Sequence, residues 1–471
     1  MGINDLFARG KKPNIVFIIT DQERSLQHWP KDFVENLPAM MRLRANGLSF
    51  SQAFTNACMC SPSRATLLTS KFPALTGVTS TGSPQPRTDL PKDLANLSTV
   101  LRKAGYNCAW RGKWHLGGGG PEDYGFLGWV PPDAGNYLSL NDTLGGGTPA
   151  NDQRILNEVF QFLDQADQNQ PFCLVASFVN PHDVYVAQYD PTLGYTEADF
   201  QKFIVPLPSN LEEDLAANNK PRAHARFSWQ RVPFENTHQE YVNFYAYLHT
   251  LVDRQILQLL DRLDLLNLTQ ETLIIRTADH GEQALSHSLL EKFYNAYEES
   301  IHIPLVFSNP IAYSKPETTH SLASLLDLVP TLAGLLGVEK DFSGSFYGRD
   351  LTPVLVNPRS TVQDFVHFTY DDIPARRAPS IIRCVRTTQY KYAVYFTQDG
   401  ADADWELYDL LEDPLENINI AGKPFYAKVQ EELDQQLRKT MRAMKTEPEF
   451  PWPPAETKFS RGTQRGSDGL R

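Results

Sequence analysis

Apolar runs alternate with amphipathic stretches along the first three quarters of the chain. Four short runs are almost wholly apolar, and they span residues 14–20, 171–178, 272–277 and 303–307. Such runs are typical of parallel strands that are buried on both faces. Residues 151–166 and 239–263 instead repeat apolar side chains at the spacing of one helix face. Strands and helices in alternation predict an α/β layered fold with a large, mostly parallel central sheet.

The pattern changes after residue 358. Short strand-like runs at residues 380–388, 390–396 and 405–410 follow one another without helices, and residues 426–444 form an amphipathic helical pattern. This order predicts a small antiparallel α+β subdomain. We therefore divide the chain into three parts, which are a catalytic α/β domain (1–358), an antiparallel α+β subdomain (359–445) and a Pro-rich arm or disordered tail (446–471).

Composition narrows the classes of protein that the chain can represent. The formal net charge of −12 argues against nucleic-acid binding, which needs a basic face, and requires that an anionic substrate be held by local cations. No apolar run is long enough to span a bilayer. The first apolar run ends at Asp21 without a cleavage site, so it predicts a buried strand rather than a signal peptide. We expect a cytoplasmic protein without a membrane or nucleic-acid partner.

The five cysteines have no spacing that indicates disulfides or a zinc cluster. Cys60 and Arg64 lie in the stretch CSPSR, just before a predicted helix with the sequence ATLLTS. A helix N-terminus offers free N–H donors and the positive end of the dipole, which suits an anion and lowers a thiol pKa. One interpretation is a reactive Cys60 beside Arg64, and the other is a buried cysteine at a helix start.

Polar residues gather where predicted strands end, and they are Asp21 and Gln22, His182 and Asp183, and Asp279 and His280. In open α/β sheets, ligands bind at the carboxyl ends of the strands. Two carboxylates, an amide oxygen and an imidazole could therefore surround one divalent cation, with oxygen favouring Ca²⁺, Mg²⁺ or Mn²⁺. Taken singly, each residue is better explained as an ordinary polar residue at a strand end.

Lys113 and His115 follow a short predicted strand around NCAW. Residues two apart on an extended segment face the same way, so both side chains would reach the same edge of the sheet. For Lys113 alone, a solvated surface lysine is the more common situation.

Seven motifs occur together in one order, and they are NIVFIITDQ, CSPSRATLLTS, GYNCAWRGKWHLG, NPHD, TADHGE, EKFYNAYEESIHIPLVF and LYDLLEDPLENINIA. Through them the sequence resembles the type I sulfatases of the alkaline phosphatase superfamily, from residue 14 to residue 421. The resemblance implies an alkaline-phosphatase-like layered fold and hydrolysis of a small-molecule or saccharide sulfate ester. It also implies that a formylglycine-generating enzyme converts Cys60 to formylglycine.

The resemblance assigns a role to each motif residue. One divalent cation, Ca²⁺ in the first place with Mn²⁺ or Mg²⁺ as alternatives, would be held by Asp21, Gln22, Cys60, Asp279 and His280. The hydrated aldehyde of Cys60 would be the nucleophile, held by Arg64 and oriented by His115. Lys113 and Lys292 would grip the sulfate oxygens. His182 would protonate the leaving alcohol or contact the sulfate.

Two positions depart from the commonest family pattern. Many members have Asp where this chain has Gln22, and several have Asn where it has His280. These variants occur in branches that include phosphonate monoester hydrolases, so metal identity and substrate stay open. The alternatives to a sulfatase are a phosphonate monoester or phosphodiester hydrolase with the same site, and a catalytically silent metal-binding homologue. The resemblance also allows a homo-oligomer.

Overall fold

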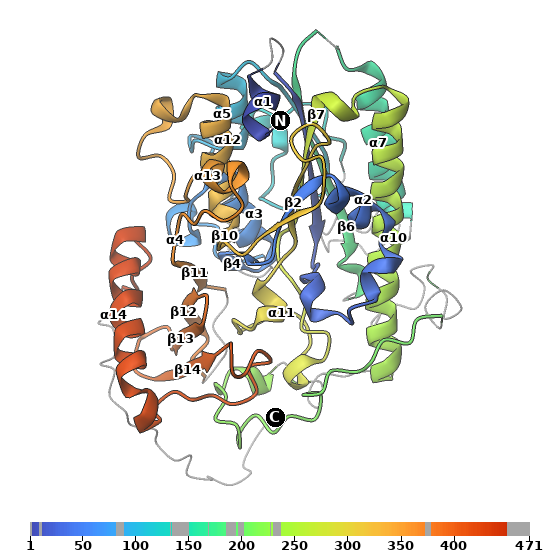
Figure 1. The fold of residues 1–471 in the computed structure, drawn as a ribbon. Coiled ribbons are helices and arrows are strands. Elements are labelled where there is room, and N and C mark those ends of the chain that lie inside the picture. The colour runs from blue at the N-terminus through green and yellow to red at the C-terminus, as the bar shows by residue number, and fades with distance from the viewer. Residues whose placement is uncertain are drawn as a thin grey trace.

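The computed structural model describes residues 2–8, 12–81, 89–131, 133, 150–167, 169–184, 195, 202–226, 228, 237–372 and 378–449. A seven-stranded sheet lies at the centre of the larger part of the molecule, and a five-stranded sheet lies beside it (Figure 1). Within the described residues, no helix combines the length and the hydropathy that crossing a membrane requires.

The central sheet contains, in spatial order, β5 (Asn107–Gly112), β6 (Phe172–Pro181), β1 (Asn14–Asp21), β7 (Thr272–Ala278), β8 (Leu305–Ser308), β2 (Gly47–Phe50) and β9 (Glu317–Thr319). The strands β5, β6, β1 and β7 are mutually parallel, so that Ile15 of β1 lies between Cys173 and Leu273. The predicted large and mostly parallel sheet is confirmed. Its parallel strands all end at one edge, where the polar residues of the motifs follow them.

The strand β8 runs in the opposite direction to the one that its sequence predicts. The run at residues 303–307 predicts a parallel strand, but β8 is antiparallel to both β7 and β2, so that prediction is wrong. A parallel connection needs a crossover of a dozen or more residues, usually a helix. Residues 279–304 contain only the short turn η6 (Ser286–Ser288) and the four-residue helix α11 (Glu298–Ile301). A fully buried antiparallel strand is as apolar as a parallel one, so the pattern could not reveal its direction.

Side chains of the central strands alternate between two cores. In β1, Ile15 and Phe17 pack into one core, while Val16 and Ile18 pack into the other. All eight positions of β1 are buried, which explains its continuous apolar sequence. Helices cover both faces (Figure 1), with α7 (Ala150–Gln165) and α10 (His238–Leu265) on one side and α3 (Cys60–Thr69), α5 (Leu97–Lys103) and α12 (Leu328–Leu336) on the other.

Short elements complete the larger part of the molecule. They are the helices α1 (Ile3–Phe7), α2 (Pro38–Ala45), α4 (Pro73–Thr76) and α13 (Thr352–Val356), and the two-residue strands β3 (Ala53–Phe54) and β10 (Ala323–Ser324).

The second sheet contains β14 (Ala403–Asp409), β13 (Tyr390–Phe396), β12 (Ile381–Thr387), β11 (Phe365–Tyr370) and β4 (Ala57–Cys58). The first four strands are antiparallel neighbours, and α14 (Ala427–Met444) packs on them through Leu433, Leu437 and Met441. The predicted antiparallel α+β unit is confirmed. The boundaries at residues 358 and 445 stay predictions, and residues 450–471 of the predicted tail lie outside the described residues.

The strand β4 links the two parts of the fold at the position that matters for chemistry. It pairs in parallel with β11, with Cys58 opposite Tyr370, and the chain reaches Cys60 two residues later. A two-residue strand is too short to show a periodic pattern, so the sequence gives no sign of it. The second sheet therefore extends directly to the start of α3.

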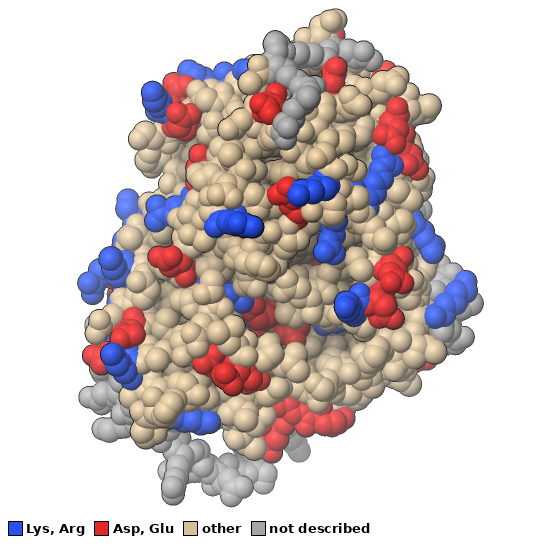
Figure 2. All heavy atoms as spheres, in the orientation of Figure 1, with Lys and Arg blue, Asp and Glu red and all other residues tan. Residues whose placement is uncertain are grey.

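Charged side chains are scattered over the face of the molecule seen in Figure 2. On this face Lys and Arg lie among Asp and Glu, and acidic side chains gather along the lower part. The excess of acidic groups agrees with the net charge of −12. An anionic substrate must therefore depend on cations inside its binding site.

We expect Leu437→Ala to lower the free energy of unfolding by about 2–5 kcal/mol, because it opens a cavity between α14 and the second sheet. The Leu437 side chain is fully buried, with 0% of its surface exposed. Leu411→Ala is the matched control, since Leu411 is 69% exposed. Urea unfolding followed by circular dichroism measures both variants. Equal losses of stability would contradict the packing described here.

Candidate active site

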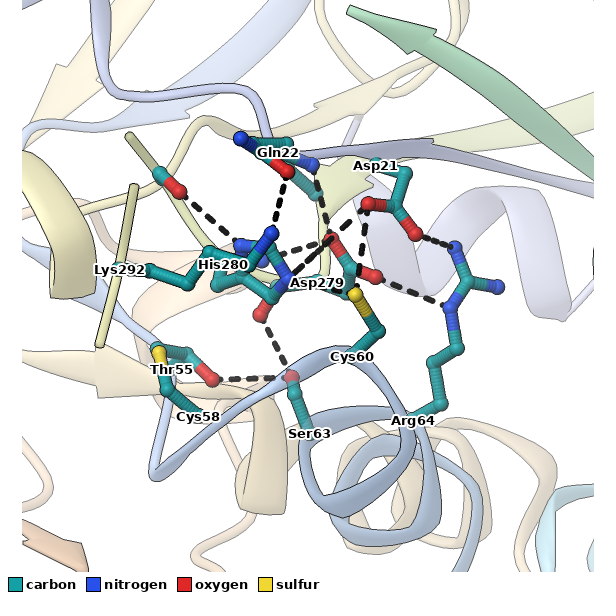
Figure 3. Close-up of polar contacts among 12 residues, drawn as sticks. Asp21, Gln22, Thr55, Cys58, Cys60, Ser63, Arg64, Asp279, His280 and Lys292 are labelled. Atoms are coloured by element: carbon teal, nitrogen blue, oxygen red, sulfur yellow. Dashed lines mark hydrogen bonds and ion pairs between the residues drawn. The ribbon is translucent and has the colours of Figure 1, made fainter. Parts of the chain in front are cut away.

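Four side chains from distant parts of the chain meet at the carboxyl edge of the central sheet. Asp21 ends β1, Asp279 and His280 follow the neighbouring strand β7, and Cys60 is the first residue of α3. One ligand atom of each lies within 4.8 Å of the others, and all four residues are buried. Figure 3 shows them pointing toward one another. The structure therefore brings together four of the five residues that the sequence suggested for a metal.

The imidazole of His280 is oriented by its own backbone neighbour. Its Nδ1 lies 3.0 Å from the carbonyl oxygen of Gly281, so Nδ1 carries the proton and donates it there. The Nε2 atom keeps its lone pair and lies 3.1 Å from Sγ of Cys60 and 3.8 Å from Oδ1 of Asp279. A histidine held in this way presents a ready ligand to a cation.

Arg64 joins the strand ends from the helix side (Figure 3). Its Nη2 bonds Oδ2 of Asp21 at 2.8 Å, and its Nε bonds Oδ2 of Asp279 at 2.9 Å. Its Nη1 donates to the carbonyl of Lys113 at 3.1 Å and to the hydroxyl of Ser177 at 2.9 Å. Because these groups are buried, such charge-assisted bonds fix the site firmly. Arg64 therefore holds both carboxylates, and its expected contact with the formylglycine oxygens stays a prediction.

The carboxylates of Asp21 and Asp279 are buried close together, and a bound cation would offset the repulsion between their negative charges. Burial tends to raise the pKa of Asp21, but Lys113, His182 and Arg64 outweigh it and hold that pKa well below its usual range. Burial and the charge of Asp21 raise the pKa of Asp279. Two neighbouring buried carboxylates favour a shared positive charge. Carboxylate oxygens with an oriented imidazole therefore fit a divalent cation.

Two lysines and the fifth predicted ligand flank this cluster. Nζ of Lys113 lies 2.7 Å from Oδ2 of Asp21, and the side chain is fully buried rather than solvated. On the other side, Nζ of Lys292 lies 2.5 Å from the amide oxygen of Gln22. The backbone N–H of Gln22 donates to Oδ1 of Asp279 at 3.1 Å. The site thus has a lysine on each side, although a surface lysine was the simpler expectation for Lys113.

Two histidines complete the set of residues from the motifs. His182 is buried, and burial together with the charge of Lys113 lowers its pKa well below the usual value. The charges of Lys292 and His115 also lower this pKa, while the charge of Asp21 raises it. The backbone N–H of His115 donates to a carboxylate oxygen of Asp133 at 2.7 Å. Asp183, also expected at this edge, accepts a hydrogen bond from the hydroxyl of Tyr195 at 2.6 Å.

The expectation of an acidified thiol at Cys60 is wrong. Burial raises the pKa of the Cys60 thiol, and the nearby Asp21 adds to this effect, while Lys113, Lys292 and Arg64 act in the opposite direction. Cys60 does begin a helix, but burial of its thiolate together with Asp21 raises the pKa more than the neighbouring cations lower it. Cys60 as a thiol is thus a buried residue at a helix start, placed beside the nitrogen of His280.

Some residues of the site were not found in the sequence. Ser177 interrupts the apolar run of β6 with a hydroxyl, and that interruption was the available signal. Glu282 and Glu291 stand inside two of the quoted motifs, and both carboxylates contact the side chain of Gln22. Asp133 gave no signal, because its contacts with the N–H groups of Trp114 and His115 depend on a tertiary approach.

The fold and the site together define an α/β protein with a buried cluster of carboxylates and an imidazole, flanked by lysines, that fits a divalent cation and an anionic ligand. The family model for sulfatases matches residues 13–338, and the model for the C-terminal part of N-sulphoglucosamine sulphohydrolase matches residues 286–443. The first of these covers more than half of the chain. The chain therefore belongs to the sulfatase family, and it is a sulfuric ester hydrolase of the alkaline phosphatase superfamily.

One curated relative agrees with this assignment, and two solved structures share the fold. An N-acetylglucosamine-6-O-sulfatase of Bacteroides thetaiotaomicron is 26% identical, over 92% of this chain and 87% of its own length. A solved structure in complex with its substrate D-glucosamine-2-N,6-O-disulfate has a TM-score of 0.77 at 24% identity, covering 93% of this chain and 99% of that one. A phosphonate monoester hydrolase of Agrobacterium radiobacter shares the fold, with a TM-score of 0.69, 20% identity and coverage of 92% and 96%.

We expect Arg64→Gln to lower the free energy of unfolding by about 3–5 kcal/mol when chelator is present, because two buried carboxylates lose their partner. Arg222→Gln is the matched control. Arg222 is 51% exposed and pairs with Asp402, and such a surface pair contributes about 0–1 kcal/mol. Urea unfolding measures both variants. A loss below about 1 kcal/mol for Arg64→Gln would show that Arg64 does not support the site.

Proposed function

We propose that the protein hydrolyses the sulfate ester of a saccharide, with formylglycine made from Cys60 as its nucleophile. A formylglycine-generating enzyme would carry out that conversion. The observation that carries the proposal is the place of Cys60, whose sulfur lies 3.1 Å from Nε2 of His280 and 3.7 Å from Oδ1 of Asp21. An oxygen nucleophile attached at this position would lie directly among the proposed metal ligands.

The two added groups supply chemistry that the twenty amino acids lack. Formylglycine would supply a hydrated aldehyde with two hydroxyl groups. One would attack the sulfur atom of the sulfate ester, and the other would allow the aldehyde to reform and the sulfate to leave. Asp21, Gln22, Asp279 and His280 would hold a divalent cation, which would supply Lewis acidity to the bound sulfate ester. The remaining groups belong to the chain itself.

The chain offers cations on both sides of the proposed nucleophile. Lys113 lies on the Asp21 side and Lys292 on the Gln22 side, and both side chains are buried. Cations in a dry site stabilise negative charge that spreads over sulfate oxygens in the transition state far better than cations in water. We therefore assign Lys113 and Lys292 to the sulfate oxygens, and Arg64 to the support of Asp21 and Asp279.

His182 enters the reaction as a neutral imidazole. Burial and the nearby lysine charge lower its pKa well below the usual value, so it carries no charge near neutral pH. An anionic ester beside it would raise that pKa, because an opposite charge favours the protonated form. With the ester bound, His182 can take up a proton from solvent, donate a hydrogen bond to the ester and pass that proton to the leaving alcohol. His115 is assigned to the orientation of the hydrated aldehyde.

Ca²⁺ is our first choice for the cation, with Mn²⁺ or Mg²⁺ as alternatives. Carboxylate and amide oxygens from Asp21, Asp279 and Gln22 suit Ca²⁺, whereas the imidazole of His280 shifts the preference toward Mn²⁺. Gln22 belongs to this proposal as a ligand through its amide oxygen.

The saccharide substrate is supported by two findings. The relative from Bacteroides thetaiotaomicron is named for a sulfated amino sugar, and the C-terminal family model carries the name of another. The likeness to a phosphonate monoester hydrolase concerns the fold alone and does not favour that reaction. The cytoplasmic location expected from the sequence remains a prediction.

The first test of this proposal is the mass of the tryptic peptide that spans Ala45–Arg64 in protein purified from its own source. We expect Cys60 to have lost its sulfur in favour of an aldehyde oxygen. Cys58 lies in the same peptide and is the internal control, since it should remain a thiol that can be alkylated. An intact thiol at Cys60 in all of the active protein would exclude the proposed nucleophile.

We also expect Cys60→Ala to reduce turnover of a saccharide sulfate by at least about 10³-fold, because the nucleophile is removed. Cys58→Ala is the matched control and should keep most of the activity. Steady-state kinetics with glucosamine-6-sulfate and with a phenyl phosphonate ester compare the two reaction classes. Faster hydrolysis of the phosphonate ester than of glucosamine-6-sulfate would contradict the proposal that sulfate esters are the substrates.

A further inference from the structure

The side-chain amide of Gln22 lies between two buried carboxylates and a lysine. Its Nε2 is 2.5 Å from Oε2 of Glu282 and 3.0 Å from Oε2 of Glu291. Its Oε1 is 2.5 Å from Nζ of Lys292. All four side chains are at least nine-tenths buried, so bulk water does not compete for these hydrogen bonds.

These contacts determine which way the amide faces. A carboxylate only accepts hydrogen bonds, so the end of Gln22 that faces Glu282 and Glu291 must be the NH₂ group. The opposite assignment would place the amide oxygen against two carboxylates and its NH₂ group against an ammonium group. The amide oxygen therefore faces the ammonium group of Lys292 (Figure 3) and points away from the two carboxylates.

Glu282 is itself held in place by three donors. Its Oε1 accepts from the hydroxyl of Tyr241 at 3.0 Å, from the N–H of Ala284 at 3.0 Å and from the N–H of Glu291 at 2.8 Å. The last of these bonds also ties the two glutamates together. Glu282 thus fixes the loop that carries Glu291, and its other oxygen is left to Gln22.

Glu291 connects the amide to the neighbouring lysine. The same oxygen that accepts from Gln22 accepts from Nζ of Lys292 at 3.0 Å. One carboxylate therefore sets the positions of a proposed metal ligand and of a proposed sulfate-binding cation at once. A neutral side chain at position 291 could instead present a donor, and the amide of Gln22 would then be free to turn.

We propose that Glu282 and Glu291 are positioning residues that orient the amide oxygen of Gln22 toward the cation and place Lys292 beside it. This inference rests on the proposed function, in which Gln22 is a metal ligand. Partners that orient a metal ligand typically change metal affinity by about 10- to 100-fold when they are replaced. The effect on metal affinity should therefore be large even though neither glutamate touches the cation.

The test measures binding of Ca²⁺ and of Mn²⁺ alone to chelator-treated full-length protein by isothermal titration calorimetry. We expect Glu291→Gln to weaken binding by about 10- to 100-fold. Glu299→Gln is the matched control. Glu299 is equally buried, and its backbone carbonyl accepts from the N–H of Glu282 at 2.9 Å, but its carboxylate faces His287. Thermal unfolding in chelator verifies the fold, and Glu282→Gln gives a second variant with the same expected direction.

A double-mutant comparison separates orientation of the amide from loss of charge. In the Gln22→Ala background, Glu291→Gln should change metal affinity by no more than about threefold, because the side chain that it orients is gone. An equal effect in both backgrounds would overturn the inference. Wild-type protein that binds neither cation would overturn the metal site of the proposed function as well. If the wild-type protein binds a cation and Glu291→Gln binds it with the same affinity, only the positioning role is overturned.

Discussion

The bonds of Arg64 to Asp21 and Asp279 are the interaction on which the rest of the site depends. One guanidinium on α3 holds the ends of β1 and β7, and it also reaches β6 through Ser177. Buried carboxylates without such a partner would strongly destabilise the fold. The same bonds leave the other oxygen of Asp21 directed at Cys60, so one set of contacts stabilises the sheet edge and shapes the site.

Much of this arrangement was predictable, because the parallel strands and the residues after them leave a direct record in the sequence. Asp21 and Asp279 follow continuous apolar runs, and neighbouring parallel strands must end at one edge. Other features leave no such record. The direction of β8 depends on the path of residues 279–304, and the pKa of Cys60 depends on burial by distant elements. Glu291 was visible in a motif, but only the folded chain shows its contact with Gln22.

The second sheet is more than an attached unit, because buried charges join it to the site. Glu298 starts α11, shortly after Lys292, and it pairs with Arg386 at 2.9 Å and Lys391 at 3.4 Å from the second sheet. Lys391 also pairs with Glu416, whose carboxylate accepts the N–H of Glu298 at 2.8 Å. On the opposite side, β4 carries the chain from the second sheet to Cys60. The segments that bear Lys292 and Cys60 are thus both fixed by this sheet.

The charges of the site also explain how an acidic protein can accept an anion. The charged groups in contact with the proposed metal ligands include the carboxylates of Glu282 and Glu291 beside Gln22, and the cations Arg64, Lys113 and Lys292 beside Asp21, Asp279 and Gln22. Where these carboxylates and those of Asp21 and Asp279 are ionised, they outnumber the cations, and a sulfate ester adds further negative charge to a dry site, which is unfavourable. A divalent cation offsets both that charge and the excess of carboxylates. A cation bound at this cluster would therefore favour binding of the anionic ester.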